Sequence, residues 1–339
     1  MSYKNENMKM IELHENGLDI QFRIRENGVV ELADFSSQEV KKAVMEPKED
    51  ICYPAVEIHR SGTGSLNMHA YKNNINQSSV DFVYENHELK AQAGGKELEI
   101  VMISPEKLKA VYHMRLFDGV PAVQTWTEII NEGSENQGLT YVSSFMYQGI
   151  SRGGEKPYYK KTDIYVPFNS WCCEAQWQKY DAETLNLNGM VVDGFNHQGY
   201  GLNRYCYSGK GTWSTCEYLP MGIAEDRETG ETYIFQIESS GQWLAEYGSA
   251  QGGNLYLALS GATEQEHGWY KNLKPGESFT TVPAGAAVVK GGLNPAAAAL
   301  TRYRRKVRRP NTDDEKLNVV FNDYMNCLMG DPTTERELS

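Results

Sequence analysis

Apolar and polar residues alternate along most of the chain, which is the pattern of β-strands that bury one face. The alternation is clear in residues 123–130, 233–237 and 255–259. Between Leu18 and Val289 almost nothing follows the helical period of 3.6 residues. The pattern predicts a chain built mainly from antiparallel strands.

Turn-forming residues separate these runs. Glycine and asparagine adopt the backbone conformations that tight turns need, and they gather in short clusters. The clusters lie at residues 26–28, 94–95, 118–119, 131–133, 252–254 and 274–276. Short strands joined by closely spaced turns are typical of a β-sandwich or barrel. We therefore expect an all-β domain over residues 1–293.

The pattern changes to that of a helix after residue 293. Asn294 is a favourable N-cap, Pro295 suits the first turn, and four alanines follow. Leu300, Tyr303 and Val307 share one helix face. Basic residues crowd the last turns, where they offset the negative end of the helix dipole, and this favours a helix end over a surface for an acidic partner. We assign residues 294–316 to this helix and a polar linker.

Residues 317–339 predict the beginning of a second domain. Residues 317–321 form a nearly continuous apolar run, as in strands of parallel sheets that are buried on both faces. Asp331 and Pro332 then resemble the start of a helix. A buried strand followed by a beginning helix is half of a β/α unit, so we expect the natural protein to continue beyond Ser339.

Composition and charge disfavour several classes of function. The formal charge is −12, with a pI of about 5.2, which disfavours nucleic acid as a partner. No apolar run approaches the roughly 20 residues that span a bilayer, and the N-terminus lacks the apolar run of a secretion signal. We expect a cytoplasmic protein that does not associate with membranes.

The cysteines do not have the spacing of a metal site. No Cys-x-x-Cys pair and no suitable Cys/His grouping occurs, so we expect no metal and no cofactor. Sparse cysteines in a long chain predict buried thiols in a reducing compartment. They are Cys52, Cys172, Cys173, Cys206, Cys216 and Cys327.

Four segments carry motifs in a characteristic order. Residues 116–131 contain a Phe-Asp-Gly-Val-Pro hairpin that runs into Trp-Thr-Glu-Ile, and residues 273–281 read Leu-Lys-Pro-Gly-Glu-Ser-Phe-Thr-Thr. The arginine-rich helix follows, and then Asn322, Tyr324 and Asp331. These motifs resemble the α-galactosidases of glycoside hydrolase family 36.

The resemblance implies a large antiparallel β-supersandwich, a linker helix and a (β/α)8 catalytic barrel, of which residues 317–339 would supply the first element. It implies a retaining mechanism with two carboxylates, which would act on terminal α-galactosides. Both carboxylates would come from later barrel strands, so we expect no catalytic residue within this chain. A carbohydrate substrate and a homo-oligomer are further implications.

The candidate substrate-binding residues are Asn322, Tyr324 and Asp331, which would follow barrel strand 1 on the face that holds active sites. By resemblance, Tyr324 would form an aromatic wall of the sugar pocket and Asp331 would accept hydrogen bonds from sugar hydroxyls. Core packing for Tyr324 and helix capping for Asp331 are the alternatives. The family has Trp where this sequence has Tyr324 and Glu where it has Met325, which leaves another α-linked sugar open.

An aspartate and two tryptophans are further candidates for functional residues. Lys161 and Asp163 imitate the first half of the family's nucleophile motif, but Tyr165 stands in place of its asparagine, so we do not assign Asp163 as a nucleophile. Trp126 is expected in the sandwich core. For Trp171, a surface or interface role remains open.

Two other functions stay in competition. Tryptophans and glycine-rich loops also suit a non-catalytic carbohydrate-binding module. A mutarotase-like sugar isomerase is the third alternative, because supersandwich folds host sugar-ring chemistry too. That activity requires a histidine and a carboxylate that converge in a cleft.

Overall fold

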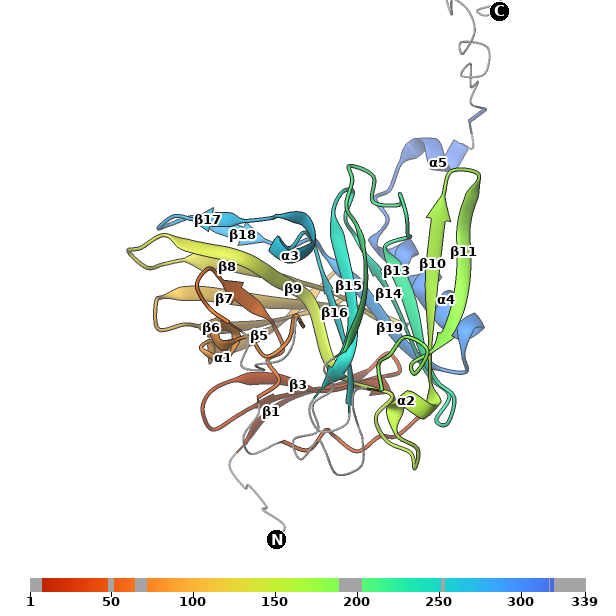
Figure 1. Ribbon diagram of the computed structural model, residues 1–339, viewed down its shortest axis with the longest axis horizontal. Coiled ribbons are helices and arrows are strands. Elements are labelled where there is room, and N and C mark those ends of the chain that lie inside the picture. Colours follow the sequence, from red (N-terminus) through yellow and green to blue (C-terminus); the bar gives the residue numbers. More distant parts are fainter. Residues whose placement is uncertain are drawn as a thin grey trace, which may run out of the picture. The chain divides into compact units, whose positions relative to one another are not determined.

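The computed structural model describes residues 8–47, 52–64, 72–188, 203–250, 254–316 and 318–319. Every strand pair within these residues is antiparallel, which confirms the predicted β-structure. The strands form three sheets (Figure 1). The chain divides into two compact units, residues 1–303 and 304–339.

The largest sheet has ten strands among the described residues. In spatial order they are β11 (Cys173–Asp181), β10 (Thr162–Ser170), β13 (Met221–Asp226), β14 (Glu231–Ile237), β19 (Ala284–Lys290), β8 (Val120–Asn131), β7 (Leu108–Phe117), β6 (Gly95–Ile103) and β5 (Val83–Gln92), with β18 (Ser278–Thr280) also paired to β8.

The second sheet has six strands among the described residues, and the third has three. The second contains β12 (Arg204–Gly209), β15 (Trp243–Ala250), β16 (Asn254–Ser260), β9 (Gln137–Ile150) and β17 (Lys271–Leu273), with β4 (Ile58–Arg60) paired to β9. The third contains β1 (Lys9–Glu15), β2 (Leu18–Ile24) and β3 (Val30–Ser37).

Short helices lie in the connections between strands. They are α1 (Gln77–Val80), α2 (Tyr158–Lys161) and α3 (Glu264–His267), and the longer helix α4 (Leu293–Val307) and α5 (Thr312–Lys316) follow the last strand. None of the described helices has the length and apolar character needed to cross a bilayer.

One aromatic core joins the three sheets. Phe235 on β14 contacts Tyr247 on β15 with 6.3 Å between ring centroids, and this pair links the ten-stranded and six-stranded sheets. Phe35 on β3 meets Phe145 on β9 at 5.5 Å, so the three-stranded sheet packs against the same core. These edge-to-face and tilted contacts add to the free energy gained by burying the rings. The packing is that of a β-sandwich.

Trp126 does not belong to this core, contrary to the sequence prediction. Around Trp126 on β8 the buried side chains are those of Thr125, Thr127 and Ile129, so Trp126 lies on the opposite face and is half-buried. Its indole stacks on the His113 ring with 4.7 Å between centroids and 8° between planes. The alternation along β8 agrees with the sequence prediction. The size and hydrophobicity of the Trp126 side chain do not determine which face of the sheet is covered by the core.

The cysteines are also more accessible than predicted. All five described cysteines are free, and Cys172, Cys173 and Cys216 are exposed. Cys172 and Cys173 lie at the turn between β10 and β11, and β11 is an edge strand with mostly exposed side chains. Position at a sheet edge therefore outweighs the usual preference of cysteine for the interior.

Helix α4 begins one residue earlier than predicted. Gly291 and Gly292 have φ values of +118° and +80°, and the Ala296 amide donates to the Gly292 carbonyl at 3.3 Å. Asn294 is therefore inside the helix and is not its N-cap. The buried face comprises Ala296, Ala299, Leu300 and Tyr303, whereas Val307 is only half-buried. Residues 312–316, predicted as linker, form α5.

Tyr303 fastens α4 to the sandwich. Its ring lies over Gly285 on β19, where a Cβ atom would come within 2.4 Å of Tyr303 Cε1. The ring also meets Phe117 edge-on at 5.6 Å, and its hydroxyl donates to Glu238. Glycine at position 285 is therefore required for the close approach of helix and strand.

The predicted barrel strand at residues 317–321 is not confirmed. Asn318 and Val319 are its two described residues, and neither lies in a strand. The side chain of Val319 is 100% exposed. The remainder of the segment lies outside the described residues.

We expect Gly285→Ala to lower the free energy of unfolding by about 1–3 kcal/mol, because the new methyl group overpacks the contact with Tyr303. Urea denaturation of the purified chain measures this. Gly241→Ala is the matched control, since a Cβ atom at Gly241 has no neighbour within 4 Å. Equal stability of both variants would contradict the close-packing argument.

Candidate functional site

The sequence-predicted substrate-binding residues cannot be placed in the structure. Asn322, Tyr324 and Asp331 all lie outside the described residues. Their proposed roles therefore stay predictions. Within the described part of the chain, the candidate sites are clusters of buried charges and cavities.

Asp163 is held as a structural anion. It is buried on β10, with Oδ2 at 2.6 Å from Lys179 Nζ and Oδ1 at 3.2 Å from Arg227 Nη1. Neighbouring Lys161 is buried too, and its Nζ lies 2.8 Å from Asp226 Oδ2. These ion pairs compensate the burial of three charges, those of Asp163, Lys161 and Asp226. The geometry agrees with the decision not to assign Asp163 as a nucleophile.

A second buried cluster surrounds Asp34 on β3. Asp34 is 2% exposed and accepts hydrogen bonds from Ser36 Oγ at 2.9 Å and Arg152 Nη2 at 2.6 Å. Burial nevertheless raises the pKa of Asp34 to about 6, against the opposing effect of the Arg152 charge. The negative charge of the fully buried Glu231 raises the pKa of Asp34 further. Perturbed carboxyls occur at active sites, but this one lies among core strands and lines none of the pockets described below.

Three side chains on the outer face of the large sheet could share a metal ion. Among the described residues, donor atoms of Glu97, Glu99 and His113 lie within 4.8 Å of one another. His113 Nδ1 is 3.0 Å from Glu97 Oε1 and 3.8 Å from Glu99 Oε1. Lys90 and Gln92 hold the other carboxylate oxygens, so an ion-pair cluster accounts for the same geometry.

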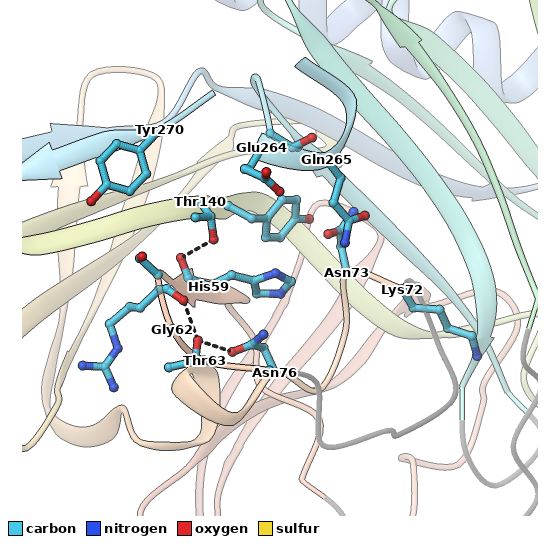
Figure 2. Close-up of a pocket in the computed structure, with 15 residues that line it drawn as sticks. His59, Gly62, Thr63, Lys72, Asn73, Asn76, Thr140, Glu264, Gln265 and Tyr270 are labelled. Carbon is cyan, nitrogen blue, oxygen red and sulfur yellow. Dashed lines mark hydrogen bonds between the residues drawn. The ribbon is translucent and has the colours of Figure 1, made fainter. Parts of the chain in front are cut away.

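A polar pocket of about 460 Å³ lies beside the six-stranded sheet. Strand β4, strand β9, helix α3 and the segment 72–76 supply its walls. Figure 2 shows Tyr270 at one end and Asn73 towards the other, with Thr140 and His59 between them. Its volume falls in the range of small-molecule sites, about 300–1,000 Å³.

Glu246 fixes the Asn73 end of this pocket. It is fully buried on β15 and accepts hydrogen bonds from the Asn73 amide at 2.8 Å and from Asn73 Nδ2 at 2.9 Å. Arg204 Nη1 donates to it at 2.6 Å, and the Tyr256 hydroxyl donates as well. The Arg204 charge compensates the buried carboxylate, so the charge and the hydrogen-bonding capacity of Glu246 are satisfied within this wall.

Glu57 holds the next residues of the same segment. Its carboxylate accepts the Ile75 amide at 2.5 Å, the Asn76 amide at 3.2 Å and Ser79 Oγ at 2.7 Å. Asn76 in turn caps α1 by accepting the Ser78 amide. Thr63 donates to the Arg60 carbonyl at 2.7 Å and lies 3.2 Å from Asn76 Oδ1, and this closes the loop after β4 (Figure 2).

Sequence reasoning missed this pocket entirely. Its residues come from four separated stretches, and the hydrogen bonds that shape it join residues 173 positions apart, such as Asn73 and Glu246. The run Lys72-Asn73-Asn74-Ile75-Asn76 is a local signal of a polar loop, but it does not reveal which side chain the loop meets.

Comparisons with known proteins locate this fold. No protein-family model matches the sequence, and no curated protein matches it either. Solved structures do match. The α-galactosidase AgaB of Geobacillus stearothermophilus, of glycoside hydrolase family 36, aligns with a TM-score of 0.69 and 15% identity over 94% of this chain and 45% of that chain.

Two further structures give the same result. A variant of the α-galactosidase AgaA of Geobacillus stearothermophilus, in complex with stachyose, has a TM-score of 0.68 and 15% identity over 91% of this chain and 44% of that chain. The α-galactosidase of Lactobacillus brevis has a TM-score of 0.64 and 14% identity over 89% and 42%. The fold is that of the N-terminal region of these enzymes.

The resemblance found in the sequence motifs is thereby confirmed at the level of fold. The chain spans less than half the length of the α-galactosidases that it matches. At about 15% identity the similarity establishes architecture, and catalytic activity has to be argued separately.

We expect the stability difference between wild type and Asp34→Asn to depend on pH. Because the folded pKa of about 6 exceeds the ordinary 3.8, the folded state binds the proton more tightly. As pH rises from about 3 to about 7, wild type should therefore lose about 3 kcal/mol relative to the variant, at about 1.4 kcal/mol per pKa unit, with about 2 kcal/mol of this loss between pH 4 and pH 6. Urea denaturation across this pH range measures it.

Asp181→Asn is the control with the opposite sign. The Thr184 amide lowers the pKa of Asp181, so wild type should lose stability relative to that variant as pH falls through the acid range. A flat difference for Asp34→Asn between pH 4 and 7 would refute the assignment of the raised pKa to Asp34.

Proposed function

We propose that this chain is the N-terminal β-supersandwich region of a cytoplasmic glycoside hydrolase that acts on terminal α-galactosides. The observation that carries the proposal is the match of 94% of this chain to 45% of an α-galactosidase, in agreement with the motif order in the sequence. Two of the matched structures, both of AgaA variants, are complexes with raffinose or stachyose, which supports a carbohydrate as the partner.

In this proposal the chain is a scaffold with one edge of the sugar site. Residues 1–293 form the supersandwich, and residues 294–316 connect it to the (β/α)8 barrel, which begins with residues 317–339. Asn322, Tyr324 and Asp331 contact the substrate, and the two carboxylates of a retaining mechanism come from later barrel strands. The protein assembles as a homo-oligomer and requires neither nucleic acid nor a membrane.

The alternatives differ in what the chain does alone. A carbohydrate-binding module binds sugar without hydrolysis, and the polar pocket beside β9 favours it as the second candidate. A mutarotase-like isomerase needs a histidine and a carboxylate that both face the ligand. His59 lines the pocket, but the carboxylate 3.6 Å from its Nε2 belongs to Glu57, which is fully buried and already accepts three hydrogen bonds. Glu264 also lines the pocket, but no hydrogen bond or ion pair joins it to His59 among the described residues, and this geometry favours binding over ring opening.

We expect the purified chain of residues 1–339 to show no hydrolysis of 4-nitrophenyl α-galactoside, because the reaction needs two facing carboxylates. Release of nitrophenol, followed by absorbance, measures this. Turnover that disappears when a carboxylate within the chain is replaced would overturn the proposal.

In protein that carries the barrel, we expect Tyr324→Ala to raise KM about tenfold and Tyr324→Phe to leave it nearly unchanged. Stacking on a sugar uses the ring, and such contacts contribute about 0.5–1.5 kcal/mol. Asp313→Asn, on exposed α5, is the control for a substitution outside the proposed sugar contacts. A KM that is insensitive to Tyr324→Ala would exclude the stacking role.

A further inference from the structure

Glu97, Glu99 and His113 form a compact cluster on the outer face of the ten-stranded sheet. Strands β5, β6, β7 and β8 lie side by side at one edge of this sheet (Figure 1). Glu99 on β6 pairs with His113 on β7, and Glu97 lies two positions before Glu99 and so on the same face. The register of two neighbouring strands therefore brings the three side chains together.

Each carboxylate of the cluster presents one oxygen to the histidine and the other to β5. Oε1 of Glu97 lies 3.0 Å from His113 Nδ1, and Oε1 of Glu99 lies 3.8 Å from it. The Oε2 atoms accept hydrogen bonds from Gln92 and Lys90, respectively. Carboxylates that bind metal ions are commonly held by outer hydrogen bonds of this kind, because these orient the ligating oxygen. Both Oε1 atoms and Nδ1 are thus held in a converging arrangement.

The spacing of these three atoms fits a tetrahedral metal ion. All three lie within 4.8 Å of one another. When the bonds from zinc to nitrogen and oxygen are about 2.0–2.2 Å long, two ligands of a tetrahedral ion are about 3.4 Å apart. The measured 3.0 Å and 3.8 Å need only small shifts to reach that value. Solvent reaches the cluster beside Glu99 and Lys90, whose side chains are 21% and 39% exposed, so water can fill the fourth position.

Glu97 is a buried carboxylate without a permanent cationic partner. Its side chain is 10% exposed. In the described part of the chain its ion-pair partner is His113, which is charged only when both ring nitrogens carry protons, and the hydrogen bond from Gln92 is neutral. A buried anion that lacks a cation is destabilising. The cluster therefore favours uptake of a cation, either a proton on the imidazole or a metal ion between the three donor atoms.

The neighbouring basic side chains do not supply this charge. Lys90 pairs with Glu99 and Glu88. Arg115 lies opposite Glu97 in the sheet, but its guanidinium is placed over a phenylalanine ring, 5.2 Å from the centroid, and among the described residues no ion pair joins it to Glu97. Three carboxylates thus share this face with two basic side chains. The local field attracts a divalent cation.

Trp126 holds the imidazole in position. The indole stacks on His113 with 4.7 Å between ring centroids and 8° between planes. The second ring nitrogen, Nε2, is buried and has no hydrogen-bond partner in the described structure. Metal-binding histidines are usually oriented by a hydrogen bond at that nitrogen. Here the stacked indole fixes the ring plane instead, and Nδ1 faces the carboxylates. This gives a role to a large aromatic side chain that lies outside the sandwich core.

We propose that Glu97, Glu99 and His113 form a binding site for a divalent transition-metal ion, with zinc as the probe. An imidazole nitrogen together with carboxylate oxygens suits zinc, whereas calcium and magnesium prefer oxygen ligands alone. The ion connects β6 with β7 and stabilises this edge of the sheet. The site contains no cysteine, so the spacing of the cysteines gave no sign of it. The function proposed above does not depend on this site.

Titration of the chain of residues 1–339 with Co²⁺ and Zn²⁺ tests the site. The exposed cysteines are first blocked with iodoacetamide, because thiolates bind the same ions. We expect one Co²⁺ per chain with the strong visible absorption of a tetrahedral ion, and its displacement by Zn²⁺. Saturating Zn²⁺ should raise the melting temperature, because the ion binds the folded state. His113→Gln and Glu97→Gln should each weaken Zn²⁺ binding by at least about tenfold.

Matched controls separate coordination from a general attraction between charges. Glu88→Gln removes a carboxylate from the same face without removing a donor atom, so it should change the Zn²⁺ affinity by less than about threefold. His14→Gln removes a histidine whose carboxylate neighbours, Asp19 and Glu12, contact opposite ring nitrogens, so their donor atoms do not converge with one nitrogen. This variant should bind Zn²⁺ like wild type.

Three results would overturn the proposal. They are the absence of saturable Zn²⁺ and Co²⁺ binding, the weak spectrum of octahedral Co²⁺, and equal Zn²⁺ affinities of Glu97→Gln and Glu88→Gln. Urea unfolding in the presence of EDTA shows whether each variant folds. If a ligand variant does not fold, Gln92→Ala on the edge strand β5 tests the same geometry, because it removes the hydrogen bond that orients Glu97. It should weaken Zn²⁺ binding about tenfold, and an unchanged affinity would also reject the site.

Discussion

Fully buried carboxylates hold the irregular parts of this molecule onto its sheets. Glu31, Glu57, Glu231 and Glu246 are each 0% exposed, and each accepts at least one backbone amide from a segment outside the regular strands or at a strand end. A buried anion without compensation would cost several kcal/mol, so each position is defined by its donors. The same bonds determine where the connecting segments run, and hence where cavities remain.

The polar pocket is a direct consequence. Glu246 and Glu57 draw residues 73–76 against the six-stranded sheet, and this leaves a space bounded by β4, β9 and α3. The Glu246 and Glu57 carboxylates are consumed in building the wall, whereas the Glu264 carboxylate and the Arg60 guanidinium also line the pocket.

Several buried carboxylates of the described sandwich are committed to structural contacts. A retaining glycosidase needs two carboxyl groups about 5–5.5 Å apart that both face the substrate. Among the described residues, Asp163 and Asp226 are neutralised by lysine or arginine, and Asp34 lies buried between strands. These groups belong to the packing of the sandwich, and the function proposed above does not depend on them.

The sequence by itself predicted the strands, most of the turns and the helix after residue 293, because these depend on local periodicity and on glycine, proline and asparagine. The order of motifs resembles that of the family 36 α-galactosidases, and the match to their N-terminal region agrees with this resemblance. Only the tertiary structure decided that Trp126 lies outside the core, that the cysteines near the β10–β11 turn are exposed, and that Tyr141, Asn73 and Tyr270 share a pocket. Those outcomes depend on pairing between residues far apart in the chain, such as Asn73 with Glu246, and local patterns carry no information about such partners.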